Sequence, residues 1–197
     1  EIRLSLVGSE MCIRDSSQNL TGIWPKKVVN YKTVMSDAAS GFTSVTYPFP
    51  VIRMADLYLM YAEALNEKGE DYATVLPWID MVRERSGLQG VKESWDQYVG
   101  NSKYATQTGL RQIIMQERRI ELAFEGHYFW DVRRWKTATT ELTQPLTGWK
   151  VRYGETDVDY YSENLVLVRD FTPKMYFWPI DIGELRKDPN LVQNYGW

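Results

Sequence analysis

Residues 110–125 read LRQIIMQERRIELAFE, and this stretch decides the fold class. Its apolar side chains recur every three or four residues, the spacing that places them on one side of an α-helix. The stripe consists of Leu110, Ile113, Ile114, Ile120 and Phe124. Gly126 predicts a break, after which residues 127–136 predict a second, shorter helix. The sequence therefore predicts helices that pack an apolar face against neighbours.

Acidic residues interrupt these apolar faces. Glu117 and Glu121 fall inside the stripe, and Asp131 lies on the apolar side of the next helix. A buried carboxylate without a partner is strongly destabilising, so each one requires a cation or several hydrogen-bond donors. Arginine suits this need because its planar guanidinium pairs with two carboxylate oxygens at once. We predict a structural network that fixes how the helices dock, with these members: Arg53, Glu63, Arg83, Arg85, Glu117, Arg118, Glu121, Glu125, Asp131, Arg133 and Arg134.

The same acids allow a catalytic interpretation. Glu117 and Glu121 are four residues apart, which on a helix separates their Cβ atoms by about 5–6 Å, near the separation that glycoside hydrolases use. A packed position would keep sugar away, and nearby arginines would lower the pKa of a general acid instead of raising it. The single histidine, His127, accompanies no serine or cysteine nucleophile motif. We therefore predict no catalytic residue and no enzyme activity.

Two further helices are predicted upstream, over residues 51–68 and 71–85. Gly69 lies at the bend between them and Pro77 predicts that the second helix begins near it or bends. The small residues and glycine of this hairpin resemble one tetratricopeptide unit. Residues 17–50 and 88–108 lack a helical period, and a short strand is predicted at 165–168. The predicted fold is mainly α, with tetratricopeptide-like helical hairpins of an α–α superhelix, long irregular loops and at most one short β-hairpin.

Composition excludes several functions. The 197 residues carry 23 Lys and Arg against 26 Asp and Glu, a net charge of -3, so no broad positive field favours nucleic acid. One cysteine, Cys12, excludes an internal disulfide, and with one histidine no Cys/His zinc site can form. No run of about 18 apolar residues predicts a membrane-spanning helix. We predict neither a metal nor a cofactor.

Residues 1–16 read EIRLSLVGSEMCIRDS. Their apolar run, residues 4–8, is too short for the core of a secretory signal, and Cys12 lacks the small preceding residues of a lipidation site. We expect residues 1–16 to be a non-native leader and residues 17–197 to form the helical domain.

Aromatic residues are abundant, with eight tryptophans and thirteen tyrosines. Those within apolar patterns are assigned to packing, namely Trp78, Trp130, Trp135 and Trp178. Aromatic side chains in polar, glycine-containing loops are candidates for stacking on sugar rings, with loops pinned by their own aromatics as the alternative. The candidate ligand contacts are Trp95, Tyr98, Trp149, Tyr153, Tyr160 and Tyr161.

Five ordered blocks of sequence resemble the SusD/RagB family, the starch-utilisation-system D-like nutrient-binding lipoproteins of bacterial outer membranes. They are VIRMA at 51–55, YAEALN at 61–66, VRERSG at 82–87, ERRIELAFEG with DVRRW at 117–135, and WPI with NLVQN at 178–194. The tail departs from the family at Asp181 and Tyr195, where proline is common. Members are much longer, so the resemblance implies that this chain is the C-terminal part of one.

The resemblance implies a helical glycan-binding protein that is not an enzyme. It implies a lipid anchor, through an N-terminal part missing from this chain, on the outer-membrane surface of Bacteroidetes. The implied partners are a glycan ligand, oligosaccharide or polysaccharide, and a TonB-dependent, SusC-like transporter that receives it. The matched arginines and glutamates belong to the structural core of the family. The alternative is a peptide- or protein-binding helical scaffold, which the hairpin at residues 51–87 suggests.

Overall fold

The computed structural model describes residues 21, 27, 30–35, 42–43, 45–150 and 156–197. The chain forms two compact units, Pro48–Trp130 and a second that combines Glu1–Tyr47 with Asp131–Trp197. The described residues are mainly helical, which confirms the predicted fold class. The boundary expected after residue 16 lies outside the described residues.

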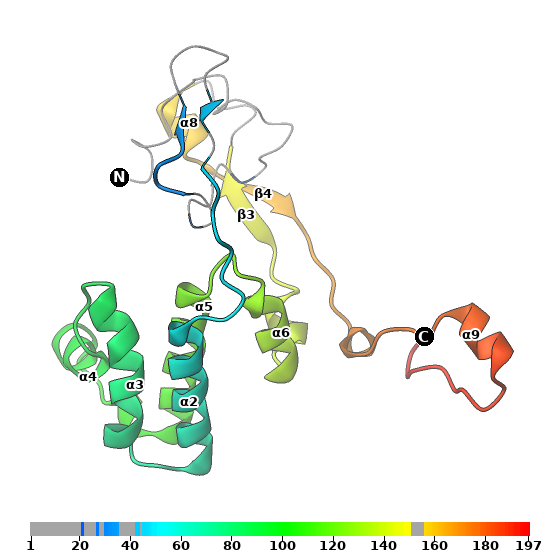
Figure 1. Cartoon of the computed structure of the whole chain (residues 1–197), viewed down its shortest axis with the longest axis horizontal. Coiled ribbons are helices and arrows are strands. Elements are labelled where there is room, and N and C mark those ends of the chain that lie inside the picture. Colours follow the sequence, from blue (N-terminus) through cyan, green and yellow to red (C-terminus); the bar gives the residue numbers. More distant parts are fainter. Residues whose placement is uncertain (1–20, 22–26, 28–29, 36–41, 44, 151–155) are drawn as a thin grey trace. The chain divides into compact units, whose positions relative to one another are not determined.

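The unit Pro48–Trp130 is built around three long helices. Helices α2 and α3 lie side by side as the predicted hairpin, and α5 packs against both (Figure 1). Two short helices and a 3-10 turn connect α3 to α5. The elements are α2 (Met54–Lys68), α3 (Tyr72–Arg85), α4 (Val91–Ser94), the π-helix η1 (Trp95–Val99), the 3-10 helix η2 (Lys103–Ala105) and α5 (Gln107–Glu121).

Local chemistry sets the ends of the hairpin helices. Gly69 adopts a left-handed conformation, with φ 87°, and its N–H donates to the Asn66 carbonyl, which ends α2. The Asp71 carboxylate accepts the Ala73 N–H at 2.8 Å and so caps the start of α3. The cap fixes the start of α3 at Tyr72, so Pro77 lies inside the helix and does not mark its start. The proline ring is exposed.

The core of this unit lies among α2, α3 and α5. Leu59 of α2, Ile79 of α3 and Ile114 of α5 are each fully buried. Burial of a side chain of this size contributes about 1.5–3 kcal/mol relative to exposure. Leu59, Val75, Ile79, Val91, Leu110 and Ile114 make up most of the fully buried cluster.

Helix α5 ends at Glu121, four residues before the predicted end. Phe124 has a left-handed backbone, with φ 64°, and therefore cannot continue the helix. Ile120 and Phe124 are 61% and 63% exposed, whereas Leu122 beyond the helix is buried. The predicted end of this helix was wrong because Ile120 and Phe124 continue the helical spacing of apolar residues although the chain turns between them.

Residues 88–108 form more structure than the predicted polar connection. Short helices α4, η1 and η2 occupy most of this segment. Tyr104 is buried, and its hydroxyl donates to Asp96 at 2.8 Å. Helical turns of three to five residues leave no detectable period, so sequence analysis missed them.

The second unit contains short elements. Helix α6 (His127–Arg134) runs across the boundary between the units. The strands β3 (Leu146–Trp149) and β4 (Glu163–Leu167) pair antiparallel, with a register shift between Leu146 and Thr147. The other elements are α7 (Ala138–Glu141), α8 (Asp157–Tyr160), the 3-10 helix η3 (Pro173–Tyr176) and α9 (Ile182–Lys187).

The prediction of at most one β-hairpin needs correction. The strand predicted at 165–168 belongs to β4, but a second antiparallel pair joins β1 (Val34–Met35) to β2 (Phe42–Thr43). Strands of two residues are too short to show the alternation by which a strand is recognised.

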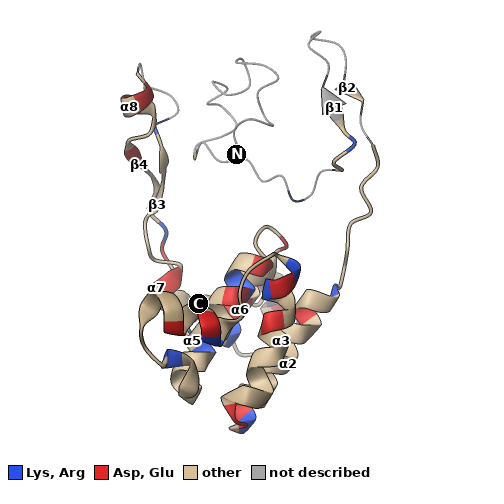
Figure 2. Cartoon of the chain, turned by 90° about the vertical axis from the view of Figure 1, so that its left-hand side faces the viewer, with Lys and Arg blue, Asp and Glu red and all other residues tan. Residues whose placement is uncertain are grey.

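Figure 2, in which the ribbon is coloured by residue type, shows acidic and basic residues interspersed along the helices. No helix in the described ranges combines the length and the apolar character that crossing a membrane requires.

The ion pair between α2 and α5 predicts a pH-dependent stability. Arg111 donates two hydrogen bonds of 2.6 Å to the Glu67 carboxylate, and these lower the pKa of Glu67. Because the folded pKa lies below the unfolded one, the stabilisation is fully present above the unfolded pKa. It is lost as the pH falls through the folded value. We predict that Glu67→Gln lowers the free energy of unfolding by about 0.5 kcal/mol near neutral pH, since the pair is half-exposed.

Urea unfolding of the wild type and Glu67→Gln at about pH 7 and about pH 2.5 measures this difference, which should disappear at the lower pH. Arg111→Gln is expected to give the same pH profile. An equal loss at both pH values would mean that the carboxylate charge is not responsible.

Candidate functional site

Arg53 connects the start of α2 to the end of α5. Its guanidinium donates to both oxygens of Glu125, at 2.7 and 2.8 Å, and to the backbone carbonyl of Glu121 at 2.6 Å. It also pairs with the Glu121 carboxylate, which Arg85 of α3 contacts at 2.6 Å. Burial lowers the pKa of Arg53, but the hydrogen bonds to Glu125 and Glu121 outweigh it and leave the pKa raised. Three helices therefore meet at one group of charges.

Two more arginines bind acids within the same unit. Arg118 of α5 donates to Asp56 of α2 at 2.9 Å, and both side chains are buried. Arg83 of α3 pairs with Glu117 of α5 and also donates to the Gln89 carbonyl at 2.8 Å. The predicted network did not contain Asp56, because its partner Arg118 is 62 residues away in the sequence and reaches it only when α5 lies alongside α2.

The remaining members of the predicted network have other surroundings. In the second unit, Arg133 donates to the backbone carbonyls of Met175 and Tyr176 at 2.6 Å, and Arg134 contacts Asp131 at 2.8 Å within α6. In the first unit, Arg111 has a raised pKa. Its hydrogen bond to Glu67 is the main cause, and the charge of Glu63 makes a smaller contribution.

Glu117 and Glu121 lie together on α5 but offer little surface to a substrate. Each side chain is only 12% exposed, and arginines from α3 or from the start of α2 engage both carboxylates. The geometry is that of helix docking.

The aromatic candidates fall into both units. Trp95 and Tyr98 lie on η1 in the unit Pro48–Trp130. Trp95 packs against the edge of the core, with the Lys103 ammonium 5.5 Å from its ring centroid. Tyr98 is 72% exposed. Tyr98 is therefore free to contact a ligand, whereas Trp95 also supports the fold.

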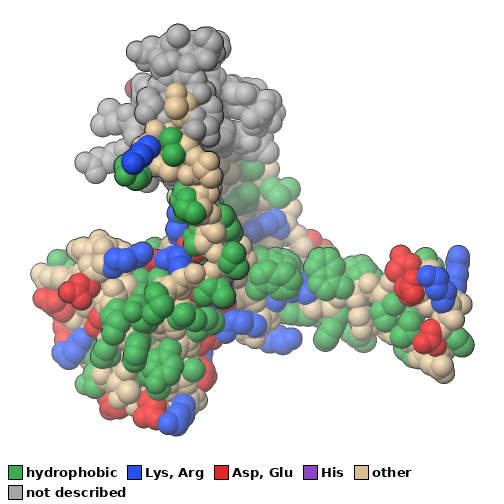
Figure 3. Space-filling view, viewed as in Figure 1, with side chains coloured by type: hydrophobic (Ala, Val, Ile, Leu, Met, Phe, Trp, Pro, Cys, Tyr) green, Lys and Arg blue, Asp and Glu red, His purple; other side chains and the backbone are tan. Residues whose placement is uncertain are grey.

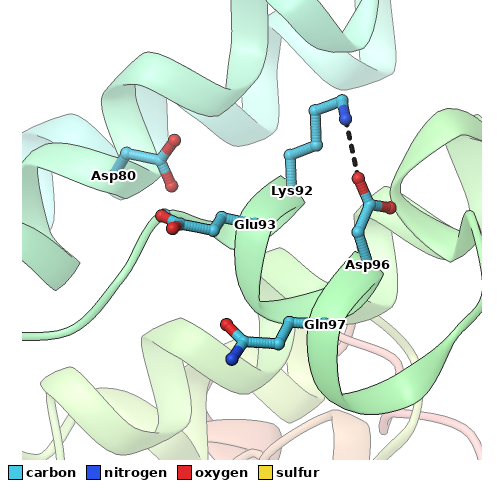
Figure 4. Close-up of a pocket in the computed structure, with 6 residues that line it drawn as sticks. Asp80, Lys92, Glu93, Asp96 and Gln97 are labelled. Carbon is cyan, nitrogen blue, oxygen red and sulfur yellow. Dashed lines mark hydrogen bonds and ion pairs between the residues drawn. The ribbon is translucent and has the colours of Figure 1, made fainter.

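A hollow of about 700 Å³ lies between α3 and the α4–η1 segment, the segment that also carries Trp95 and Tyr98 (Figure 4). Asp80, Gly90, Lys92, Glu93, Asp96 and Gln97 line it. Figure 4 shows the Asp80 and Glu93 carboxylates turned toward each other, and the Lys92 ammonium contacts Asp96 at 2.7 Å. Sequence analysis missed this hollow, because its walls come from segments that meet only in the folded unit.

The charges of Lys92 and Asp96 stabilise each other. The hydrogen bond to Asp96 raises the pKa of Lys92. Hydrogen bonds from Lys92 and then from Tyr104 lower the pKa of Asp96. Both groups therefore remain charged near neutral pH.

Two side chains of α3 fasten the segment that forms the hollow. Asp80 accepts the backbone N–H of Val91 at 2.7 Å, at the start of α4. Arg83 donates to the Gln89 carbonyl and to the Ser94 hydroxyl at 3.1 Å. The hollow is consequently held in shape before any ligand arrives.

The other aromatic candidates pack on one another in the second unit. Trp149 and Tyr161 make an edge-to-face contact with ring centroids 5.5 Å apart, and Tyr160 and Tyr161 make another at 5.2 Å. Trp149 is 38% exposed. Tyr153 lies outside the described residues. The described part of this cluster combines packing with an exposed tryptophan face.

The assignment of four tryptophans to packing needs correction. Trp130 and Trp178 are 60% and 66% exposed, whereas Trp78 packs against Tyr58 and Tyr61. An apolar neighbourhood in the sequence does not fix the side of the element on which a ring lies. Trp130 precedes the buried Val132 by two residues, which on a helix places it on a different side.

No group of three or more metal-type side chains that could hold an ion occurs among the described residues.

The model of the SusD family matches residues 11–197. The chain belongs to the SusD family. SusD-like protein P25 of Formosa agariphila is 39% identical over 144 residues, which cover 73% of this chain and 23% of that protein.

Two solved structures from Bacteroides fragilis resemble this member of the family. A SusD-like protein shares 28% identity with a TM-score of 0.71, covering 91% of this chain and 31% of the other. A SusD-like carbohydrate binding protein shares 31% identity with a TM-score of 0.59, covering 76% of this chain and 29% of the other. The chain therefore spans less than a third of the length of these relatives.

Replacement of Arg53 is expected to destabilise the unit Pro48–Trp130 strongly. Arg53→Met leaves the partly buried Glu121 and Glu125 without their main cation, so the free energy of unfolding should fall by about 2–3 kcal/mol. Arg85→Met, at a side chain that is 58% exposed, should cost less than about 1 kcal/mol. Denaturant unfolding of both variants measures the difference. Equal, small losses would show that the Arg53 contacts do not stabilise the docked helices.

Proposed function

We propose that this SusD-family chain is part of a protein that binds oligosaccharide or polysaccharide at the bacterial outer-membrane surface. The bound glycan is not cleaved there and is delivered to a TonB-dependent, SusC-like transporter. The family match over residues 11–197 carries this proposal. A similar solved structure is described as a carbohydrate binding protein. The lipid anchor and the transporter contact are proposed for the whole protein, of which this chain represents less than a third of the relatives' length.

The geometry of η1 supports sugar binding. Tyr98 presents an exposed ring, and the neighbouring Asp96 and Gln97 line the hollow. A sugar offers an apolar C–H face to an aromatic ring and hydroxyl groups to carboxylates and amides. The hollow of about 700 Å³ has the size of known ligand sites. Trp149, Tyr160 and Tyr161 form a second candidate contact in the other unit.

Non-catalytic binding is supported by the engagement of Glu117 and Glu121. A hydrolase needs two carboxyl groups that flank the glycosidic bond. Here arginine side chains contact both carboxylates, which are only 12% exposed.

A peptide- or protein-binding scaffold is the second candidate function, and the surface of α2 favours it. Hydrophobic side chains gather over the hairpin in Figure 3, and they include Met54, Leu57, Met60 and Tyr61. Titration with oligopeptides separates this function from glycan binding.

Removal of the Tyr98 ring is expected to weaken glycan binding. A panel of polysaccharides is screened by affinity electrophoresis, and the best ligand is titrated by calorimetry. Tyr98→Ala should then raise Kd about fivefold, the loss expected for one aromatic contact. Tyr195→Ala removes another highly exposed tyrosine, at 83%, and should leave Kd unchanged.

If Tyr98→Ala binds as tightly as the wild type while Trp149→Ala does not, the contact belongs to the second unit. A chain that binds oligopeptides and no polysaccharide would support the scaffold instead.

Incubation with any polysaccharide that the chain binds is expected to release no new reducing ends, because Glu117 and Glu121 are committed to arginines. A reducing-sugar assay over an extended incubation makes this measurement. Cleavage that Glu121→Gln abolishes without loss of the fold would establish a hydrolase.

A further inference from the structure

We infer that the hollow between α3 and the α4–η1 segment selects saccharides by charge, accepting neutral and amino sugars and rejecting those that carry carboxylate or sulfate groups. This inference rests on the proposed glycan binding and names the class of glycan. The lining includes Gln97, the residue before Tyr98, and belongs entirely to the unit Pro48–Trp130.

The charges of the lining do not cancel. Of the six lining residues, all within the described part of the chain, Asp80, Glu93 and Asp96 are acidic and Lys92 alone is basic. The Lys92 ammonium lies 2.7 Å from Asp96, so these two charges neutralise each other. The carboxylates of Asp80 and Glu93, which face each other in Figure 4, leave two negative charges at the wall.

These two carboxylates have neutral hydrogen-bond donors. Asp80 accepts the backbone N–H of Val91 at 2.7 Å, and Glu93 accepts a long hydrogen bond of 3.5 Å from the Gln89 amide. Such donors leave the charge of a carboxylate in place. Glu93 is exposed, and its second oxygen can accept a hydrogen bond from a ligand.

Two cations of the surrounding elements, Lys103 and Arg83, are engaged elsewhere. The Lys103 ammonium lies over the Trp95 ring, 5.5 Å from its centroid. Arg83 pairs with Glu117 and holds Gln89 and Ser94. Neither cation belongs to the lining of the hollow.

This arrangement suits hydroxyl groups and disfavours anions. Hydrogen bonds from sugar hydroxyls to ionised carboxylates are stronger than those between neutral groups. A sulfate or uronate at the same place would approach two negative charges. One unit charge about 4 Å away in water already changes an equilibrium constant by about fivefold. An amino sugar carries a positive charge, so the same two carboxylates strengthen its binding.

Asp80 cannot easily turn its charge away from the hollow. Asp80 is fixed by its bond to the start of α4, and Arg83 ties the same segment to α3 and α5. A preorganised wall keeps its selectivity because the bound ligand does not rearrange it.

Matched saccharide pairs test the inference on the full chain. The probes are polygalacturonate with its methyl ester, a sulfated galactan with its desulfated form, and a chitosan hexamer with its N-acetylated form. The neutral member of each acidic pair should bind at least about fivefold tighter at low salt. In about 1 M NaCl, where charges are screened beyond about 3 Å, the difference in Kd between the two members of a pair should become smaller.

Glu93→Gln tests the site itself, because Glu93 is exposed and supports no other charge. This variant should bind the anionic member of a pair about threefold tighter, while the Kd of the neutral member changes by less than about twofold. Glu93→Lys should strengthen the binding of the anionic member further. The control is Glu70→Gln, which makes the same charge change near the opposite end of α3 and should leave the difference in Kd unchanged.

Three results decide the matter. The inference is supported if the difference in Kd between the anionic and neutral saccharides disappears in Glu93→Gln and persists in Glu70→Gln. Anionic saccharides that bind as tightly as their neutral forms, or a difference that Glu93→Gln does not alter, would overturn it while leaving glycan binding intact. Failure of every saccharide to bind would overturn the proposed function together with the inference.

Discussion

The contact of Arg53 with Glu121 and Glu125 holds together the unit from Pro48 to Trp130. One guanidinium joins residues about 70 positions apart in the chain and contacts the carboxylates and a backbone carbonyl at the end of α5. Phe124 lies within this turn in a left-handed conformation that costs roughly 1 kcal/mol for a residue with a side chain. The Arg53 contacts on either side of Phe124 compensate for that strain. The end of α5 is therefore fixed by tertiary contacts.

Helix α3 connects this framework to the candidate site. Its buried side, with Val75 and Ile79, packs into the core. The same helix provides Asp80 and Arg83, which hold the α4–η1 segment. Arg83 also pairs with Glu117 of α5, so the arginine network and the hollow share a residue. Stability and the shape of the candidate site thus depend on the same helix.

Membership of the SusD family gives this arrangement a functional context. Glycan capture is the function proposed for the whole protein, and the charges of the hollow are the basis on which we infer selection among glycans. In this inference, the carboxylates of Asp80 and Glu93 offer hydrogen-bond acceptors to hydroxyl groups and repel anionic substituents. The apolar surface of α2 remains a separate feature, and its exposure fits a contact with protein.

The sequence by itself determined the presence of the long helices, the bend at Gly69 and the family, because periodicity, capping residues and ordered motifs are local properties. It also indicated that Glu117 and Glu121 require cations. It did not assign Arg53 to Glu125 or Arg118 to Asp56, because these partners are about 60 to 70 residues apart and meet only when α2 and α5 pack together. The exposure of Trp130 and the hollow between α3 and the α4–η1 segment were likewise decided by the tertiary structure, since exposure and cavity shape depend on how separate elements pack.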